Sequence, residues 1–87
     1  MVLHIGQEVV VKTADILGIF DMENTTVSRP TRDFLAQAEK RGRVITVCDD
    51  LPRSFVVCRD KDGIETVYIS QISCATLRKR ANNVQFE

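Results

Sequence analysis

The chain has 87 residues, and its 12 lysines and arginines balance 12 aspartates and glutamates, so the formal net charge is zero. This length predicts one domain with a thin core, and the charge balance excludes a polybasic arm or tail as the main binding device. Apolar residues make up 44% of the chain, which excludes simple disorder. No apolar run reaches the roughly 20 residues of a membrane span, and the N-terminus lacks the features of a signal peptide. We therefore expect a soluble, cytoplasmic protein that has no membrane partner.

The first half of the chain predicts three strands and a helix. β-branched and other apolar residues gather in three strand segments, at 2–5, 8–12 and 16–21. A polar loop is expected at 22–29. Pro30 then suits the first turn of a helix, and Ser28 is the better N-cap. That helix is expected to end near Arg41, because Gly42 follows.

The second half predicts three more strands and a second helix. The strands are expected at 43–48, 54–58 and 64–69. Between the last two, the segment Asp60–Gly63 ends in an Asp-Gly pair, which is a strong signal for an antiparallel hairpin. Ser73 caps a helix over 74–81, and residues 82–87 are expected to form a frayed tail. The order βββ-α-βββ-α predicts one α+β domain over 1–81, with a small antiparallel-rich sheet of five or six strands.

Several predicted strands carry apolar residues at successive positions, although side chains alternate between the two faces of a strand. These runs are Val9-Val10-Val11, Ile16-Leu17 with Ile19-Phe20, and Phe55-Val56-Val57. Two short helices hardly cover both faces of such a sheet, and large exposed apolar patches are unusual on monomers. We therefore expect a homo-oligomer. The alternative is a tightly curled monomeric sheet whose two sides are partly covered by loops.

The cysteines indicate packing rather than chemistry. There are three, Cys48, Cys58 and Cys74, and each lies in an apolar stretch. Their odd number and their spacing exclude a disulfide framework, and neither a C-x-x-C pair nor a partner for His4 predicts a metal site. The chain also lacks a phosphate-binding glycine motif. We therefore expect neither an enzyme nor a cofactor.

Basic side chains form four groups along the sequence. They are Arg29 with Arg32, Lys40 with Arg41 and Arg43, Arg53 alone, and Arg78-Lys79-Arg80. In a single protomer each group is typical of a solvated face. In a symmetric oligomer every group is repeated, so that several weak patches together can follow a phosphate backbone.

A series of short motifs runs through the chain in a distinctive order and spacing. They are Leu3-His4-Ile5-Gly6, Val9-Val10-Val11, Ile19-Phe20-Asp21, Arg32-Asp33-Phe34-Leu35, Arg53-Ser54-Phe55-Val56 and the run from Tyr68 to Arg78. Together they resemble the RemA/RemB family of small extracellular-matrix regulators of Firmicutes, and its RemB-like branch in particular, over nearly the whole chain. The resemblance implies a ring-shaped homo-oligomer that binds double-stranded DNA and regulates the transcription of biofilm-matrix genes.

The resemblance also implies that DNA phosphates are contacted by basic side chains, which position the duplex but carry little base specificity. The candidates are Arg53, Arg32, Arg29 and Lys12. No helix-turn-helix and no aromatic stacking platform is evident, so that readout of DNA shape is favoured over direct reading of bases. No small-molecule ligand is expected.

The sequence departs from the family pattern at two places. One arginine of the pattern falls at Asp15, and an arginine pair falls at Asp50 and Leu51. The carboxylates of Asp15, Asp49 and Asp50 repel phosphate. The alternative function is therefore a protein–protein interaction module on the same oligomeric scaffold, with the DNA surface lost. A small-molecule-sensing domain is a third class, which no ligand motif supports.

Overall fold

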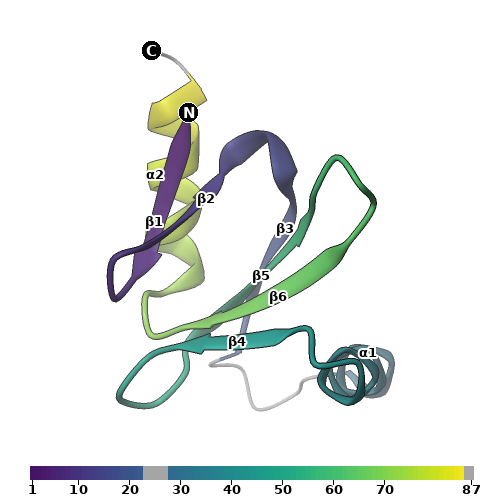
Figure 1. Cartoon of the computed structure of the whole chain (residues 1–87). Helices are drawn as coiled ribbons and strands as arrows, with labels where there is room; N and C mark the ends of the chain where they lie inside the picture. Colours follow the sequence, from purple (N-terminus) through teal and green to yellow (C-terminus); the bar gives the residue numbers. More distant parts are fainter. Residues whose placement is uncertain (23–27, 86–87) are drawn as a thin grey trace.

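The structure is a computed structural model that describes residues 1–22 and 28–85. In these residues six strands and two α-helices follow one another in the order βββ-α-βββ-α (Figure 1). They are β1 (Val2–Gly6), β2 (Val9–Lys12), β3 (Ile16–Asp21), α1 (Arg29–Lys40), β4 (Val44–Val47), β5 (Ser54–Arg59), β6 (Glu65–Ser70) and α2 (Cys74–Gln85). A short 3-10 turn, η1 (Thr13–Asp15), joins β2 to β3. The predicted α+β class and element order are confirmed.

The strands form two sheets, so the prediction of a single sheet of five or six strands is wrong. β1 and β2 form an antiparallel hairpin, and the other strands form a four-stranded sheet in the order β3-β5-β6-β4. Pairing in this larger sheet is antiparallel except between β6 and β4, which run parallel. The reason for the difference is η1, which interrupts the extended chain after β2. The hairpin therefore packs over the larger sheet instead of extending it.

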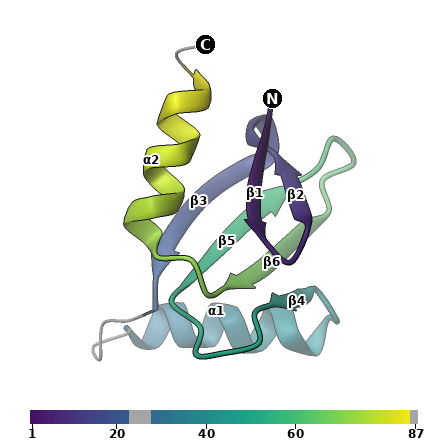
Figure 2. The same cartoon turned by 90° about the vertical axis from the view of Figure 1, so that its left-hand side faces the viewer.

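Both faces of the four-stranded sheet are partly covered by the chain itself, most completely over β5 (Figure 2). On one face α1 packs its buried Ala38 against Phe55. On the other face the hairpin and α2 bury Ile5 and Leu77 in a cluster with Val56. Five of the six residues of β5 are consequently buried. The successive apolar residues of this strand thus need no second subunit, because the hairpin supplies the cover that two helices alone would not.

The predicted caps fix the beginnings of both helices. The Ser28 hydroxyl accepts the N–H of Thr31 at 3.3 Å, and the Ser73 hydroxyl accepts the N–H of Thr76 at 3.2 Å. Each bond satisfies a backbone donor that has no partner inside its helix. After α1, Gly42 adopts a φ of +68°, in the left-handed region that favours glycine at helix ends.

The ends of several elements differ from the predicted ends. α2 continues to Gln85, past the end expected at residue 81, and the strand ends shift by about one residue, as is common. Part of the predicted polar loop, 23–27, and the end of the predicted tail, 86–87, lie outside the described residues. Neither helix of the described chain is long and apolar enough to cross a membrane.

Candidate nucleic-acid interface

Arg53 is held in place by backbone hydrogen bonds on both sides. Its N–H donates to the carbonyl of Ser70 at 2.8 Å, and its carbonyl accepts the N–H of Met22 at 2.9 Å. These bonds fix Arg53 between the ends of β6 and β3, directly before β5. The residue is exposed, as a phosphate contact requires.

Lys12 lies at the opposite end of the sheet from Arg53. β3 runs antiparallel to β5, with Ile16 opposite Cys58 near the end of β5. Lys12 comes before β3, across η1, whereas Arg53 comes before β5, so the length of β5 separates them. Its six residues span roughly 20 Å. One protomer therefore does not bring these two side chains to the same phosphate.

Arg29 and Arg32 lie together at the start of α1, and both are exposed. Figure 2 shows α1 behind the four-stranded sheet and the hairpin that carries Lys12 in front of it. Within one protomer the four predicted DNA contacts thus do not share one surface, because Lys12 lies on the hairpin side of the sheet and the arginine pair lies on the α1 side.

Two other basic residues are engaged in holding the fold together. Arg78 Nη2 donates to the carbonyl of Ile19 at 2.9 Å, and Arg80 Nη1 donates to the carbonyl of His4 at 3.5 Å. Both bonds attach α2 to strands that are 59 and 76 residues away in sequence. The spacing of charges along the sequence does not indicate hydrogen-bond partners that are so far away in the chain. From the sequence alone, these arginines are therefore expected only to lie on a solvated face.

The turn between β4 and β5 holds two of the three carboxylates that are expected to repel phosphate. Asp50 Oδ1 accepts the N–H of Leu51 at 2.8 Å, and the N–H of Asp49 donates to Gln71 Oε1 at 3.1 Å. Both aspartates are exposed, and Leu51 is 79% exposed, more than any other large apolar residue in the described part of the chain. From the sequence, Leu51 is noted only as a position where the family pattern has an arginine, and its exposure is not predicted. The available signal was a leucine inside an Asp-Asp-Leu-Pro turn, where no strand or helix buries it.

The third such carboxylate, Asp15, lies near a buried thiol and a phenol. Burial, with a further contribution from the charge of Asp15, raises the pKa of the Cys58 thiol from 9.0 to about 11. Burial also raises the pKa of Tyr68, with contributions from Cys58 and Asp15. Both groups are neutral at pH 7, and Cys58 packs in the hydrophobic core. All three cysteines are free thiols, and the described residues contain no group of three metal-ligating side chains.

The architecture defines a small α+β domain whose exposed basic side chains are dispersed around a four-stranded sheet. Residues 2–81 match the family described as RemA-like, extracellular matrix regulatory protein A-like, and the chain belongs to that family. It is 35% identical over 81 residues to extracellular matrix regulatory protein B of Bacillus subtilis (strain 168), a match that covers 93% of this chain and 90% of that protein. The resemblance inferred from the sequence motifs is confirmed, and the family is one of extracellular-matrix regulation.

Proposed function

We propose that the protein is a DNA-binding transcriptional regulator of extracellular-matrix genes that acts in the cytoplasm as a ring-shaped homo-oligomer. Membership of the RemA-like family over residues 2–81 supports the regulatory role. The observation that carries the physical argument is the dispersed placement of the basic side chains. Because one protomer has no net charge and its candidate contacts do not share one surface, symmetric repetition would align positive charge along a phosphate backbone.

The positions of the helices favour contacts with phosphates over the reading of bases. α1 and α2 pack on opposite faces of the sheet, so they do not form a helix-turn-helix pair. Exposed arginines that are repeated around a ring instead position a duplex and respond to its shape or curvature. Double-stranded DNA is therefore the proposed partner, and Arg53, Lys12, Arg29 and Arg32 are the candidate contacts.

A protein–protein interaction module on the same scaffold is the second candidate. The turn between β4 and β5 favours it, because Leu51 is exposed there and Asp49 and Asp50 repel a phosphate. In that function the oligomer persists and DNA binding is absent. The two candidates therefore differ in a property that a single binding assay measures.

Binding of a labelled duplex at two salt concentrations tests the proposal. Arg53→Ala and Lys12→Ala should each weaken binding to unrelated sequences alike and reduce the salt-dependence slope by about one for each DNA phosphate that is no longer neutralised. Lys40→Ala is the matched control, since it removes the same charge from an exposed position at the end of α1. Asp15→Arg should tighten binding, because it replaces a carboxylate with the guanidinium of the family pattern.

The negative outcomes are equally specific. If the wild-type protein binds no duplex even at low salt, the DNA proposal fails and the interaction module takes its place. If Arg53→Ala and Lys40→Ala weaken binding equally, the proposed contact surface is wrong. Nucleic acid that co-purifies with the protein and is removed by a high-salt wash, measured by the absorbance ratio, would support the proposal independently.

A further inference from the structure

β4 lies at one edge of the four-stranded sheet, with no strand on its outer side. The N–H of Val67 donates to the carbonyl of Arg43 at 2.8 Å, and Val44 lies opposite Val67 in the parallel register. In a parallel ladder every second residue bonds to the neighbouring strand. Ile45 therefore bonds to β6, whereas Val44 and Thr46 direct their N–H and C=O groups outward. In the described part of the chain these outward groups have no hydrogen-bond partner.

The residues of β4 carry none of the features that usually protect a sheet edge. The strand reads Val44-Ile45-Thr46-Val47, which contains no charge, no proline and no glycine. Ile45 is 44% exposed although it lies in the middle of the strand, and Thr46 beside it is exposed as well. An open edge of β-branched residues pairs readily with another strand. The outer side of β4 is therefore a surface suited to the addition of a strand.

The opposite edge of the same sheet, β3, is protected. The carbonyl of Ile19 accepts a bond from Arg78 Nη2 at 2.9 Å and another from Cys74 Sγ at 3.5 Å. Both donors belong to α2, which thus covers the middle of β3. The register with β5 also shifts between Ile16 and Gly18, an irregularity that bends a strand. A second copy of this chain consequently offers the β4 edge of its larger sheet, and not the β3 edge, for pairing.

Two β4 strands match each other when they run antiparallel. A two-fold axis at the centre of the strand sets Ile45 opposite the partner's Ile45 and Val44 opposite the partner's Thr46. Since Val44 and Thr46 carry the outward groups, each such pair exchanges two hydrogen bonds. Ile45 then occupies the non-hydrogen-bonded position, where facing side chains lie closest. This single register uses the outward groups of both residues and covers the exposed Ile45.

The charges at the two ends of β4 favour the same antiparallel direction. The exposed Arg41 and Arg43 precede β4, and the exposed Asp49 and Asp50 follow it. Figure 1 shows α1 and the turn between β4 and β5 beyond opposite ends of β4. In an antiparallel pair the basic end of one strand lies beside the acidic end of the other, whereas a parallel pair sets like charges side by side. A second copy of this chain therefore suits the edge by its charge as well.

We propose that two copies of this chain join their larger sheets through β4, antiparallel and with Ile45 at the centre. The same surface serves on both copies, so an assembly in which every chain makes this contact has an even number of chains. This inference rests on the homo-oligomer of the proposed function and deepens it. The paired residues, 43–47, include none of the candidate DNA contacts, and Leu51 at the tip of the following turn lies outside them.

A disulfide between two introduced cysteines tests the register. Facing residues at a non-hydrogen-bonded position have Cα atoms about 4.5 Å apart, which is within the range of a disulfide. In a Cys48→Ser background, which removes the native thiol next to β4, Ile45→Cys should form a cross-linked species of twice 9.8 kDa on a non-reducing gel. Thr46→Cys is the matched control, because the same residue of the partner lies two positions further along. The absence of a cross-link in Ile45→Cys, or equal cross-linking of both variants, overturns the register.

The mass in solution tests whether the contact holds the assembly together. Ile45→Lys places two like charges opposite each other, and should lower the mass at least twofold by light scattering on a size-exclusion peak. Val10→Lys is the matched control and should keep the wild-type mass, because Val10 is also 44% exposed but lies on β2, outside the larger sheet. Circular dichroism checks folding. If Ile45→Lys does not fold, Thr46→Pro replaces it, since proline removes an outward N–H and spares the bonds to β6.

These measurements separate the contact from the proposed function. If the wild type is oligomeric and Ile45→Lys keeps its mass, the contact is wrong while the homo-oligomer stands. A loss of mass in Val10→Lys alone assigns assembly to the hairpin and also overturns the contact, as does an odd number of chains. A monomeric wild type overturns both proposals. Because assembly is measured without DNA, these outcomes decide the contact even if the protein binds no duplex.

Discussion

The two connections on either side of β5 are similar in composition but differ in the hydrogen bonds that their aspartates make. Each contains a pair of aspartates, Asp49 and Asp50 before β5, and Asp60 and Asp62 after it. Before β5, the Asp50 carboxylate binds the N–H of the next residue, and the apolar side chain of Leu51 is left in water. After β5, the polar groups of the turn bind one another.

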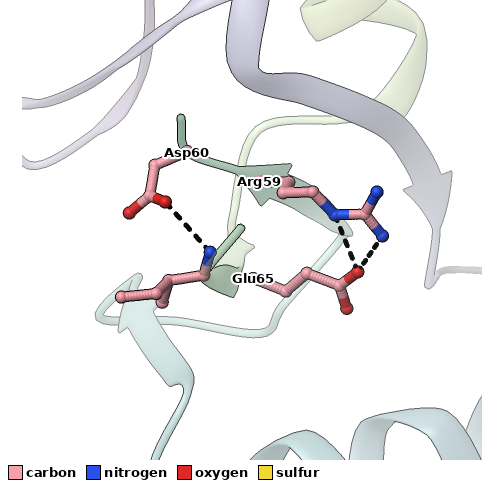
Figure 3. Close-up of polar contacts among 4 residues, drawn as sticks. Arg59, Asp60 and Glu65 are labelled. Carbon is pink, nitrogen blue, oxygen red and sulfur yellow. Dashed lines mark hydrogen bonds and ion pairs between the residues drawn. The ribbon is translucent and has the colours of Figure 1, made fainter. Parts of the chain in front are cut away.

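In the connection after β5, polar groups of the same chain bind one another (Figure 3). Asp60 Oδ1 accepts the N–H groups of Asp62 and Ile64, both at 2.9 Å. Gly63 adopts a φ of +80° and donates its N–H to the carbonyl of Asp60 at 3.0 Å. Aspartate in a turn therefore does not by itself show the purpose of the turn. The carboxylates after β5 hold their own turn together, whereas the turn before β5 keeps an exposed leucine.

The largest effect on stability is expected at Cys58, which lies just before the connection between β5 and β6. Below pH 9 the thiol is protonated in both states, but between its ordinary pKa of 9.0 and its folded pKa of about 11 only the unfolded state loses the proton. The free energy of unfolding should therefore fall by roughly 2 to 3 kcal/mol from pH 9 to pH 11. Urea unfolding across this range, at one protein concentration, measures the loss.

The control for this prediction is Cys58→Val, which keeps the packing and removes the ionisable group. Tyr68 also has a raised pKa and ionises in both proteins, so the informative quantity is the difference between them. Equal pH dependence of the wild type and Cys58→Val would show that the thiol is not responsible.

The second largest effect on stability is expected from a substitution at Gly63, in the connection between β5 and β6. Its φ of +80° is costly for a residue with a Cβ atom, although no neighbouring atom would contact that Cβ. Gly63→Ala should therefore lower the free energy of unfolding by about 1 to 2 kcal/mol, through backbone strain alone. Lys61→Ala, an exposed position in the same turn, should change it by less than about 0.5 kcal/mol. Equal losses in thermal or urea unfolding would contradict this account.

Loss of the Asp60 carboxylate should have a somewhat smaller effect. Asp60→Ala removes an acceptor that serves two backbone N–H groups, and should cost about 1 kcal/mol. Amide hydrogen exchange at Asp62 and Ile64 should become faster, because these are the N–H groups that lose their acceptor. Asp60→Asn retains an acceptor oxygen and should recover most of the protection; exchange as fast as in Asp60→Ala would argue against the assigned bonds.

The smallest effect is expected from the ion pair at the base of the same connection. Arg59 donates to Glu65 through Nε at 3.1 Å and also through Nη2. Because both side chains are partly exposed to solvent, a double-mutant cycle with Arg59→Ala and Glu65→Ala should give a coupling energy of about 0.2 to 1 kcal/mol. The coupling should shrink in high salt. A coupling that is large and independent of salt would show a desolvated pair.

Local signals were enough to predict much of this structure. The order of strands and helices, the Ser28 and Ser73 caps, and the hairpin at Asp62-Gly63 are each confirmed. Each depends on residues that are close in sequence, where backbone preferences and a single side-chain bond decide the conformation. The family was also predictable, because the order and spacing of its motifs are properties of the sequence.

The tertiary structure alone decided how these elements combine and where the functional side chains lie. Strand pairing across long separations placed the first hairpin over the larger sheet and set β4 parallel to β6. It also separated Lys12 from Arg53 by the length of β5, and it set the β4–β5 turn and α1 beyond opposite ends of β4. Local backbone propensity does not determine such arrangements. They depend on the burial of apolar surface and on hydrogen bonds between residues that are far apart in the chain.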